Sequence, residues 1–269
     1  MTEDFLSRWL LRLGFSAPPP TTLNSLAQLQ RAHLDAFAFE NVDPLLGRVP
    51  NLDADATAAK LLRQGRGGYC FELNGLFAGG LRQIGFGVTV RLARVLWRRS
   101  EPGPETHCLL IVSVAGCDFV SDVGFGGPVP VAPVPLSPGQ GSNESGYCLV
   151  EHDLGPLLCS RGGDGRETPL YVITQTRADP DSLAEGNRLA ATAPTSPFTQ
   201  RLIAARVVAD RRIVLENTRL VERTLDGVEI CSSQLTRSSV IDALSDRFGL
   251  TLTPDEKVRV RDWLKTQSS

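Results

Sequence analysis

The spacing of hydrophobic residues divides the 269-residue chain into parts with different periods. Up to about residue 85, apolar positions recur at intervals of three and four residues, which is the period of an amphipathic helix. Thr22 and Asp53 precede two of these stretches and can bind the first free amides of a helix. A further helix is expected to begin at the glycines just before Cys70. The pattern predicts a helical bundle over residues 1–85.

From Val88 onward the apolar positions alternate, which is the period of a half-buried strand. A proline-rich loop between residues 128 and 138 interrupts the pattern, and weaker strand signals follow it. The expected strands cover residues 88–97, 106–114, 118–123, 147–150 and 170–176. These segments predict a central antiparallel sheet or barrel over residues 86–195.

The last part of the chain mixes both periods. Residues 179–193 have helix-forming composition, and short strand-like pieces follow over residues 206–234 with a turn at Asp226-Gly227. Two helices are expected over residues 238–248 and 254–265. A mixed α/β part over residues 196–269 would complete an α+β protein.

Composition narrows the classes of partner. The chain is 42% hydrophobic and carries 28 basic and 30 acidic residues, interspersed, for a net charge of −2. That balance offers no basic stripe for a phosphate backbone, which argues against a nucleic-acid partner. No apolar run is long enough to span a membrane, and the acidic start is unlike a secretory signal. A cytoplasmic protein is expected, and assembly as a homodimer is left open.

Cysteine is the first candidate for chemistry. The six cysteines never form a closely spaced pair, so neither a zinc site nor any other bound metal is expected, and no permanently bound cofactor is implied. Cys70 is distinguished by its expected place at a helix N-terminus. There, unpaired amides and the helix dipole favour the thiolate, which is the nucleophilic form of a thiol.

A base for this thiol must come from three histidines. His33 fits a packed helix and His152 a turn, whereas His107 lies on a rigid apolar strand. A two-residue turn at Ala115-Gly116 would place residue 109 opposite residue 122. His107 and Asp122 would then share one face as diagonal neighbours. The sequence therefore predicts a Cys-His-Asp triad, in which the carboxylate orients the imidazole.

Several segments resemble the arylamine N-acetyltransferase family. Residues 66–74 (RGGYCFELN) match its Arg-Gly-Gly-Tyr-Cys-Phe-Glu-x-Asn segment. The other matching segments are Phe-Glu-Asn at residues 39–41, Thr-His at 106–107, the aspartate loop at 122–127 and a segment over 187–198. These pieces occur in family order, which is far more specific than one short motif.

The resemblance implies a helical bundle, a β-barrel and an α/β lid, with the triad on Cys70, His107 and Asp122. It implies ping-pong transfer from acetyl-CoA, which is a substrate rather than a resident cofactor, to an arylamine, hydrazine or hydroxylamine. Phe39 and Phe125 match positions that line the acceptor pocket. The positions matched to CoA contacts are Trp97, Thr106, Gly126 and Gly127.

Other functions use the same fold or the same chemistry. One alternative is an amide synthase that acts on a carrier-bound acyl chain in ansamycin-type biosynthesis. Another is a thiol hydrolase with the same triad, and a third is a CoA-binding protein without catalysis. Apart from the reaction, Glu40 and Arg66 are expected to pair and hold the cysteine loop.

Overall fold

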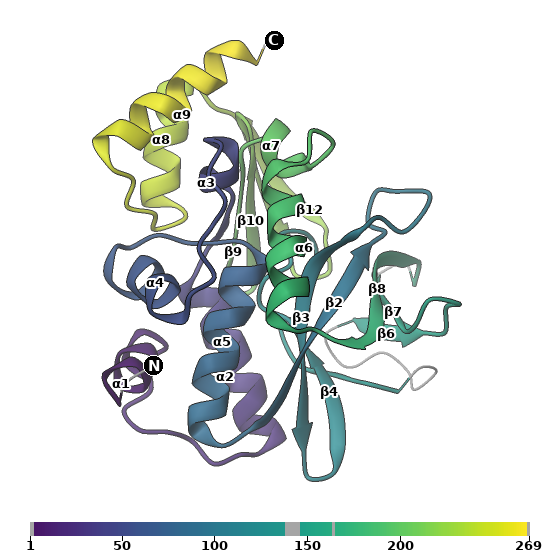
Figure 1. Cartoon of the computed structure of the whole chain (residues 1–269). Helices are drawn as coiled ribbons and strands as arrows, with labels where there is room; N and C mark the ends of the chain where they lie inside the picture. The colour runs from purple at the N-terminus through teal and green to yellow at the C-terminus, as the bar shows by residue number, and fades with distance from the viewer. Residues whose placement is uncertain (1–2, 138–145, 163–164, 268–269) are drawn as a thin grey trace.

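The computed structural model describes residues 3–137, 146–162 and 165–267. Its first part is helical, as predicted, and the helices are α1 (Glu3–Arg12), α2 (Leu23–Ala36), α3 (Val42–Leu45), α4 (Ala54–Ala58) and α5 (Cys70–Ile84). In Figure 1 α1, α2, α4 and α5 lie at the lower left, beside the barrel strands, with α3 above them. The two predicted caps are confirmed: the Thr22 hydroxyl accepts from the Ser25 amide at 3.2 Å, and Asp53 likewise caps α4.

The start of α5 corrects one prediction. The helix begins at Cys70 and not at the preceding glycines. Gly68 instead forms a bridge with β1 (Phe39–Glu40), in which its carbonyl accepts from the Glu40 amide at 2.9 Å. A Cβ on Gly67 would lie 2.2 Å from the carbonyl oxygen of Ala38. The glycines therefore allow close approach of the protein's own backbone.

The middle of the chain forms an antiparallel sheet that nearly closes on itself. Its strands are β2 (Gly87–Val95), β3 (Glu105–Val114), β4 (Cys117–Ser121), β5 (Val134–Pro135), β6 (Tyr147–Val150), β7 (Leu157–Arg161) and β8 (Glu167–Arg177). They are ordered β5-β4-β3-β2-β8-β7-β6, and the two edge strands β5 and β6 contact each other. The predicted barrel is confirmed in this near-closed form. Strand β7 was not predicted, because its short apolar run does not alternate.

The predicted register of one hairpin is also confirmed. Leu110 pairs with Ser121, so continuing the same pairing brings residue 109 opposite residue 122. Ala115 and Gly116 have φ values of 50° and 80°, as a two-residue turn of this kind requires.

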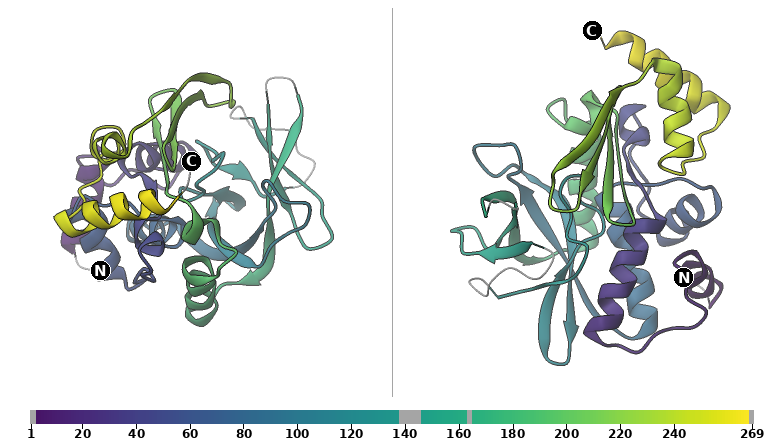
Figure 2. Two further views of the ribbon diagram at one scale, coloured as in Figure 1. Left: turned by 90° about the horizontal axis from the view of Figure 1, so that it is seen from above. Right: turned by 180° about the vertical axis from the view of Figure 1, so that it is seen from behind.

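Helices α6 (Pro180–Thr192) and α7 (Pro197–Gln200) lead into a second sheet. This lid sheet joins β1 to β9 (Ile203–Val208), β10 (Arg211–Glu216), β11 (Arg219–Thr224) and β12 (Glu229–Gln234), in that order. In both figures it stands between the barrel and the last helices, α8 (Arg237–Asp246) and α9 (Pro254–Thr266) (Figures 1 and 2). Because β1 comes from the helical part and pairs with β9, the lid sheet is anchored next to the cysteine loop.

Hydrophobic packing links the helices and the barrel. A single cluster of buried side chains runs from Phe5 on α1 to Val207 on β9, and it includes both Cys70 and Cys108. A second cluster holds the lid sheet against α8 and α9. Among the described residues, no helix combines the length and apolar character required to cross a membrane.

Candidate active site

Cys70 is the first residue of α5 and lies almost entirely inside the protein, with 2% of its surface exposed. The loop after β4 passes directly over it. A Cβ on Gly124 would lie 2.6 Å from the Cα of Cys70, so only glycine lets this loop come so close. The cysteine and the aspartate loop are thereby brought into one site.

His107, on β3, donates through Nε2 to Oδ2 of Asp122 at 2.8 Å. Both side chains are buried. Because Nε2 is engaged by the carboxylate, Nδ1 is the nitrogen left for the thiol of Cys70. The structure therefore brings the three residues of the predicted triad together.

Asp122 is surrounded by hydrogen-bond donors. Oδ1 accepts from Asn74 Nδ2 at 2.9 Å and from the Gly124 amide at 2.8 Å, and Oδ2 accepts from the Tyr171 hydroxyl at 2.8 Å. Tyr171 was not predicted from the sequence. Asn74 was visible as part of the cysteine motif, and its spacing of four residues from Cys70 places both on one face of α5.

The charges of the triad follow from these contacts. Burial raises the pKa of the Cys70 thiol, but hydrogen bonds with Cys108 and His107 and the charge of His107 outweigh it and lower the pKa to about 6. Burial lowers the pKa of His107, but the charge of Asp122 and its hydrogen bond raise it to about 10. At neutral pH the site therefore holds a thiolate beside an imidazolium.

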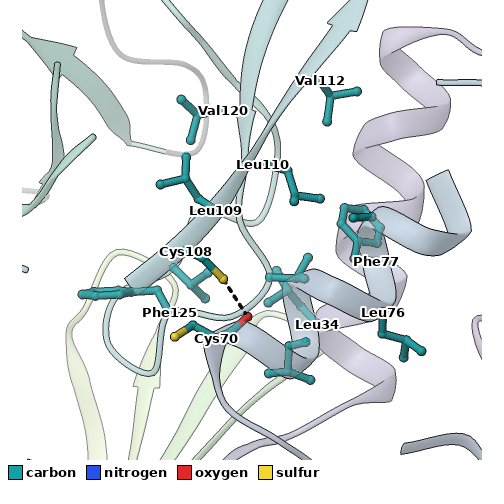
Figure 3. Packing of buried hydrophobic residues seen from close by; sticks show 14 of the residues in the cluster. Leu34, Cys70, Leu76, Phe77, Cys108, Leu109, Leu110, Val112, Val120 and Phe125 are labelled. Atoms are coloured by element: carbon teal, nitrogen blue, oxygen red, sulfur yellow. Dashed lines mark hydrogen bonds between the residues drawn. The ribbon is translucent and has the colours of Figure 1, made fainter. Parts of the chain in front are cut away.

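Cys108 is a second thiol at this site that sequence reasoning missed. Its Sγ donates to the backbone carbonyl of Cys70 at 3.4 Å, and Figure 3 shows the two side chains next to each other with Phe125 beside them. It directly follows His107 on β3, so its side chain reaches the cysteine from the other face of that strand. Burial raises the pKa of Cys108, which keeps this thiol protonated and able to donate.

Comparison with known proteins agrees with this geometry. Residues 22–258 match the sequence model of a family described as N-acetyltransferase. The arylamine N-acetyltransferase of Mycolicibacterium smegmatis is 34% identical over 97% of this chain and 98% of its own length. This chain belongs to the arylamine N-acetyltransferase family. It is an acetyltransferase.

Solved structures of the family share the whole fold. The arylamine N-acetyltransferase of Salmonella typhimurium superposes with a TM-score of 0.90 at 32% identity, covering 97% of this chain and 99% of the other. The enzyme from Mycobacterium marinum in complex with CoA gives a TM-score of 0.86 at 33% identity, covering 97% of each chain.

Aromatic rings surround the triad of this acetyltransferase. The Phe125 ring lies 5.2 Å from the His107 ring and 5.9 Å from the Trp97 ring, measured between centroids. Phe39 and Phe125 line one small cavity of about 20 Å³. A Cβ on Gly126 would lie 2.6 Å from the Phe39 ring, so the glycine makes room for that ring. Of the two phenylalanines predicted for the acceptor, Phe125 thus packs against the triad and Phe39 shares a cavity with Phe125.

A larger cleft of about 430 Å³ lies between the barrel and the lid sheet. Its walls include Trp97, Gly126 and Gly127, three of the four residues predicted to contact CoA. Thr106, the fourth, is not among the described residues that line the cleft. Its carbonyl oxygen instead lies 3.8 Å from the Sγ of Cys70. The volume is in the range that holds a small ligand.

Ion pairs fix the segment that precedes Cys70. Arg66 donates to Glu40 through Nη2 at 2.7 Å, which confirms the predicted pair, and to Glu256 on α9 through Nη1 at 2.6 Å. Lys60 contacts both Asp43 and Glu72 at 2.6 Å. Glu72 in turn accepts from the Tyr69 amide at 3.2 Å at the start of α5. The charged cluster therefore ties the C-terminal helix and the cysteine loop together.

Proposed function

We propose that this enzyme carries an acetyl group from acetyl-CoA to an arylamine, hydrazine or hydroxylamine as a thioester on Cys70. In this mechanism His107 is the general base and acid, and Asp122 orients it. The observation that supports the assignment best is the hydrogen bond between His107 Nε2 and Asp122, beside a thiol whose pKa is lowered to about 6.

The first half of the reaction charges the enzyme. The Cys70 thiolate attacks the acetyl carbonyl of acetyl-CoA, and the bond between that carbon and the CoA sulfur breaks. The CoA thiolate takes a proton from the His107 imidazolium as it leaves. Because the acetyl group moves from one thiol to another, the free energy of this step is close to zero and the acetyl group stays reactive.

The second half delivers the acetyl group. The amine nitrogen attacks the thioester carbonyl, His107 accepts the proton that the nitrogen loses, and the Cys70 thiolate leaves. The buried Asp122 stabilises the imidazolium at this stage and does not itself take the proton. The enzyme returns to its starting charges.

The surroundings suit these substrates. Trp97, Gly126 and Gly127 are proposed to contact CoA along the cleft, and Thr106 to contact its thioester end beside Cys70. Phe39 and Phe125 are proposed to receive the acceptor ring, because flat aromatic faces bind aromatic amines well. Acetyl-CoA binds as a substrate and no resident cofactor is proposed. A cytoplasmic location and a homodimer remain predictions from the sequence.

Intact-mass measurement tests the mechanism directly. After incubation with acetyl-CoA, the protein is expected to gain one acetyl group on Cys70, which persists in buffer and disappears when an arylamine is added. Cys70→Ala should gain none. Rapid loss in buffer alone would indicate a thiol hydrolase, and no adduct from acetyl-CoA but one from a carrier-bound acyl chain would indicate an amide synthase.

A further inference from the structure

Five arginines line the cleft between the barrel and the lid sheet, and one of them differs from the rest. Four form ion pairs with glutamates: Arg98 with Glu216, Arg161 with Glu167, and both Arg219 and Arg223 with Glu229. Arg212 on β10 has no carboxylate partner among the described residues. It is also the most buried of the five, with 5% of its surface exposed.

The hydrogen bonds of Arg212 leave much of its guanidinium unused. Nη2 donates to the Val129 carbonyl at 3.3 Å and to the Tyr147 hydroxyl at 3.2 Å. Nε is buried and has no hydrogen-bond partner in the part of the chain that the structure describes. A guanidinium cannot lose its charge at any ordinary pH, so burial without a counterion costs free energy. An anion bound in the cleft would supply the missing partner.

Arg212 lies close to the reaction centre. It lines the small cavity that Phe39 and Phe125 also line, and it borders the larger cleft as well. Phe125 in turn packs against His107, with 5.2 Å between ring centroids. One aromatic side chain therefore separates the region of Arg212 from the triad.

This position favours one source of the anion. In acetyl-CoA the whole pantetheine arm separates the reacting sulfur from the nearest phosphate, so a donor bound at Cys70 carries its phosphates well away from the triad. A substituent on the ring of an aromatic acceptor lies only a few bonds from the reacting nitrogen. We propose that Arg212 binds the carboxylate of an acceptor whose ring lies against Phe125, so that the enzyme prefers anionic arylamines. The inference deepens the function proposed above and rests on it.

Deacetylation of the isolated acetyl-enzyme tests the proposal without CoA present. Wild type and Arg212→Gln are acetylated, freed of CoA and mixed with 3- or 4-aminobenzoate, or with the neutral 3- and 4-aminobenzamides. For at least one isomer we expect the deacetylation rate of the variant to fall by about 10- to 100-fold with the aminobenzoate, because a charge-assisted hydrogen bond is lost. With the matching aminobenzamide the rate should fall by less than about 3-fold. Comparing each acceptor between the two proteins cancels its intrinsic nucleophilicity.

Matched variants separate binding from folding. Arg212→Lys keeps the charge and should recover part of the aminobenzoate rate. Arg211→Gln changes the neighbouring arginine of β10, which is exposed and paired with Glu222, and should leave all rates unchanged. Equal losses with charged and neutral acceptors, or no loss with either isomer, would overturn the proposal.

The remaining outcomes are also decisive. Arg212→Gln could instead slow acetylation by acetyl-CoA but not by S-acetylpantetheine, which has no phosphate. If the ratio of the aminobenzoate rate to the aminobenzamide rate is then the same as in the wild type, Arg212 binds the phosphates of CoA and the inference is wrong. If wild type forms no acetyl-enzyme at all, the proposed function fails instead. Calorimetric titration with aminobenzoate and aminobenzamide would then still show whether Arg212 binds the carboxylate.

Discussion

Asp122 accepts a hydrogen bond from His107 Nε2 at 2.8 Å, and this contact fixes which ring nitrogen of His107 faces the thiol of Cys70. The other carboxylate oxygen of Asp122 accepts from Asn74 on α5, which is far from it in sequence. The carboxylate is fully buried. Burial raises the pKa of Asp122, but the charge of His107 and the hydrogen bonds from His107, Asn74 and Gly124 outweigh it and lower the pKa. The ring orientation and the imidazolium charge therefore both depend on one ionised side chain.

Replacing this charge should abolish most of the activity. We expect Asp122→Asn to lower kcat/KM for acetyl-CoA by about 10³- to 10⁴-fold, since the amide neither stabilises the imidazolium nor holds the same tautomer. Tyr171→Phe removes one donor but keeps the carboxylate and its bond to His107, so its loss should be about 10-fold or less. Steady-state kinetics with thermal melts checks both. Near-normal turnover in a folded Asp122→Asn would contradict the assigned role.

The thiol of Cys108 should help to keep Cys70 ionised. In the wild type, alkylation of Cys70 by iodoacetamide should rise with pH to half its maximum near pH 6, where its pKa lies. Cys108→Ala removes a weak donor whose single proton also goes to the Cys70 carbonyl, so the midpoint should move up by less than about one pH unit. Cys108→Ser keeps a donor and should move it less. An unshifted midpoint in Cys108→Ala would assign the ionisation to His107 alone.

The ion pairs of Arg66 should matter for stability. Its side chain is only 7% exposed, and it pairs with both Glu40 and Glu256. Arg66→Gln would leave the buried Glu40 carboxylate without its ion-pair partner, whereas Glu256 would keep Arg48 at 2.7 Å, so the free energy of unfolding should fall by about 3–5 kcal/mol. Arg63→Gln removes a surface arginine that lies 3.9 Å from Asp4 and should cost less than about 1 kcal/mol. Urea denaturation compares the two; equal losses would mean that the cluster contributes no more than a surface pair.

Much of the candidate site could be predicted from local sequence patterns. The two-residue turn at Ala115-Gly116 sets the register of β3 and β4, and that register alone brings His107 near Asp122. The caps at Thr22 and Asp53 are equally local, because a cap involves residues only two or three positions apart. The sequence could therefore predict these features from neighbouring residues.

The parts that were missed depend on distant contacts. Tyr171 reaches Asp122 from β8, whose pairing with β2 shifts register between Arg91 and Ala93, and no local pattern predicts such a bulge. Arg212 lies on β10 next to the buried Ile213, and an arginine on such a strand would ordinarily be expected in solvent. Its burial follows only from the way the barrel meets the lid sheet.

A buried histidine outside the active site should make stability depend on pH. His33 on α2 is fully buried and packs against Phe37 and Phe77, with ring centroids 4.6 Å and 5.0 Å away. Its Nδ1 accepts from the Trp9 indole at 3.3 Å, and its Nε2 has no partner among the described residues. Burial lowers the pKa of His33 to about 3, so this side chain is neutral in the folded protein at every pH above that value.

In the unfolded chain the same histidine takes up a proton below about pH 6.5, its ordinary pKa. Between pH 6.5 and about 3 the unfolded state therefore binds one more proton, and stability falls as pH falls, by about 1.4 kcal/mol per pH unit from this residue. Urea denaturation between pH 5.5 and 4 should show that the free energy of unfolding of His33→Gln, which can still accept from Trp9, falls by about one proton, or about 1.4 kcal/mol per pH unit, less steeply than that of the wild type. Trp9→Phe should be less stable but keep the wild-type slope, because His33 stays buried. If the free energy of unfolding of His33→Gln depends on pH as steeply as that of the wild type, His33 takes up the proton in the folded protein as well, and burial does not keep its ring neutral.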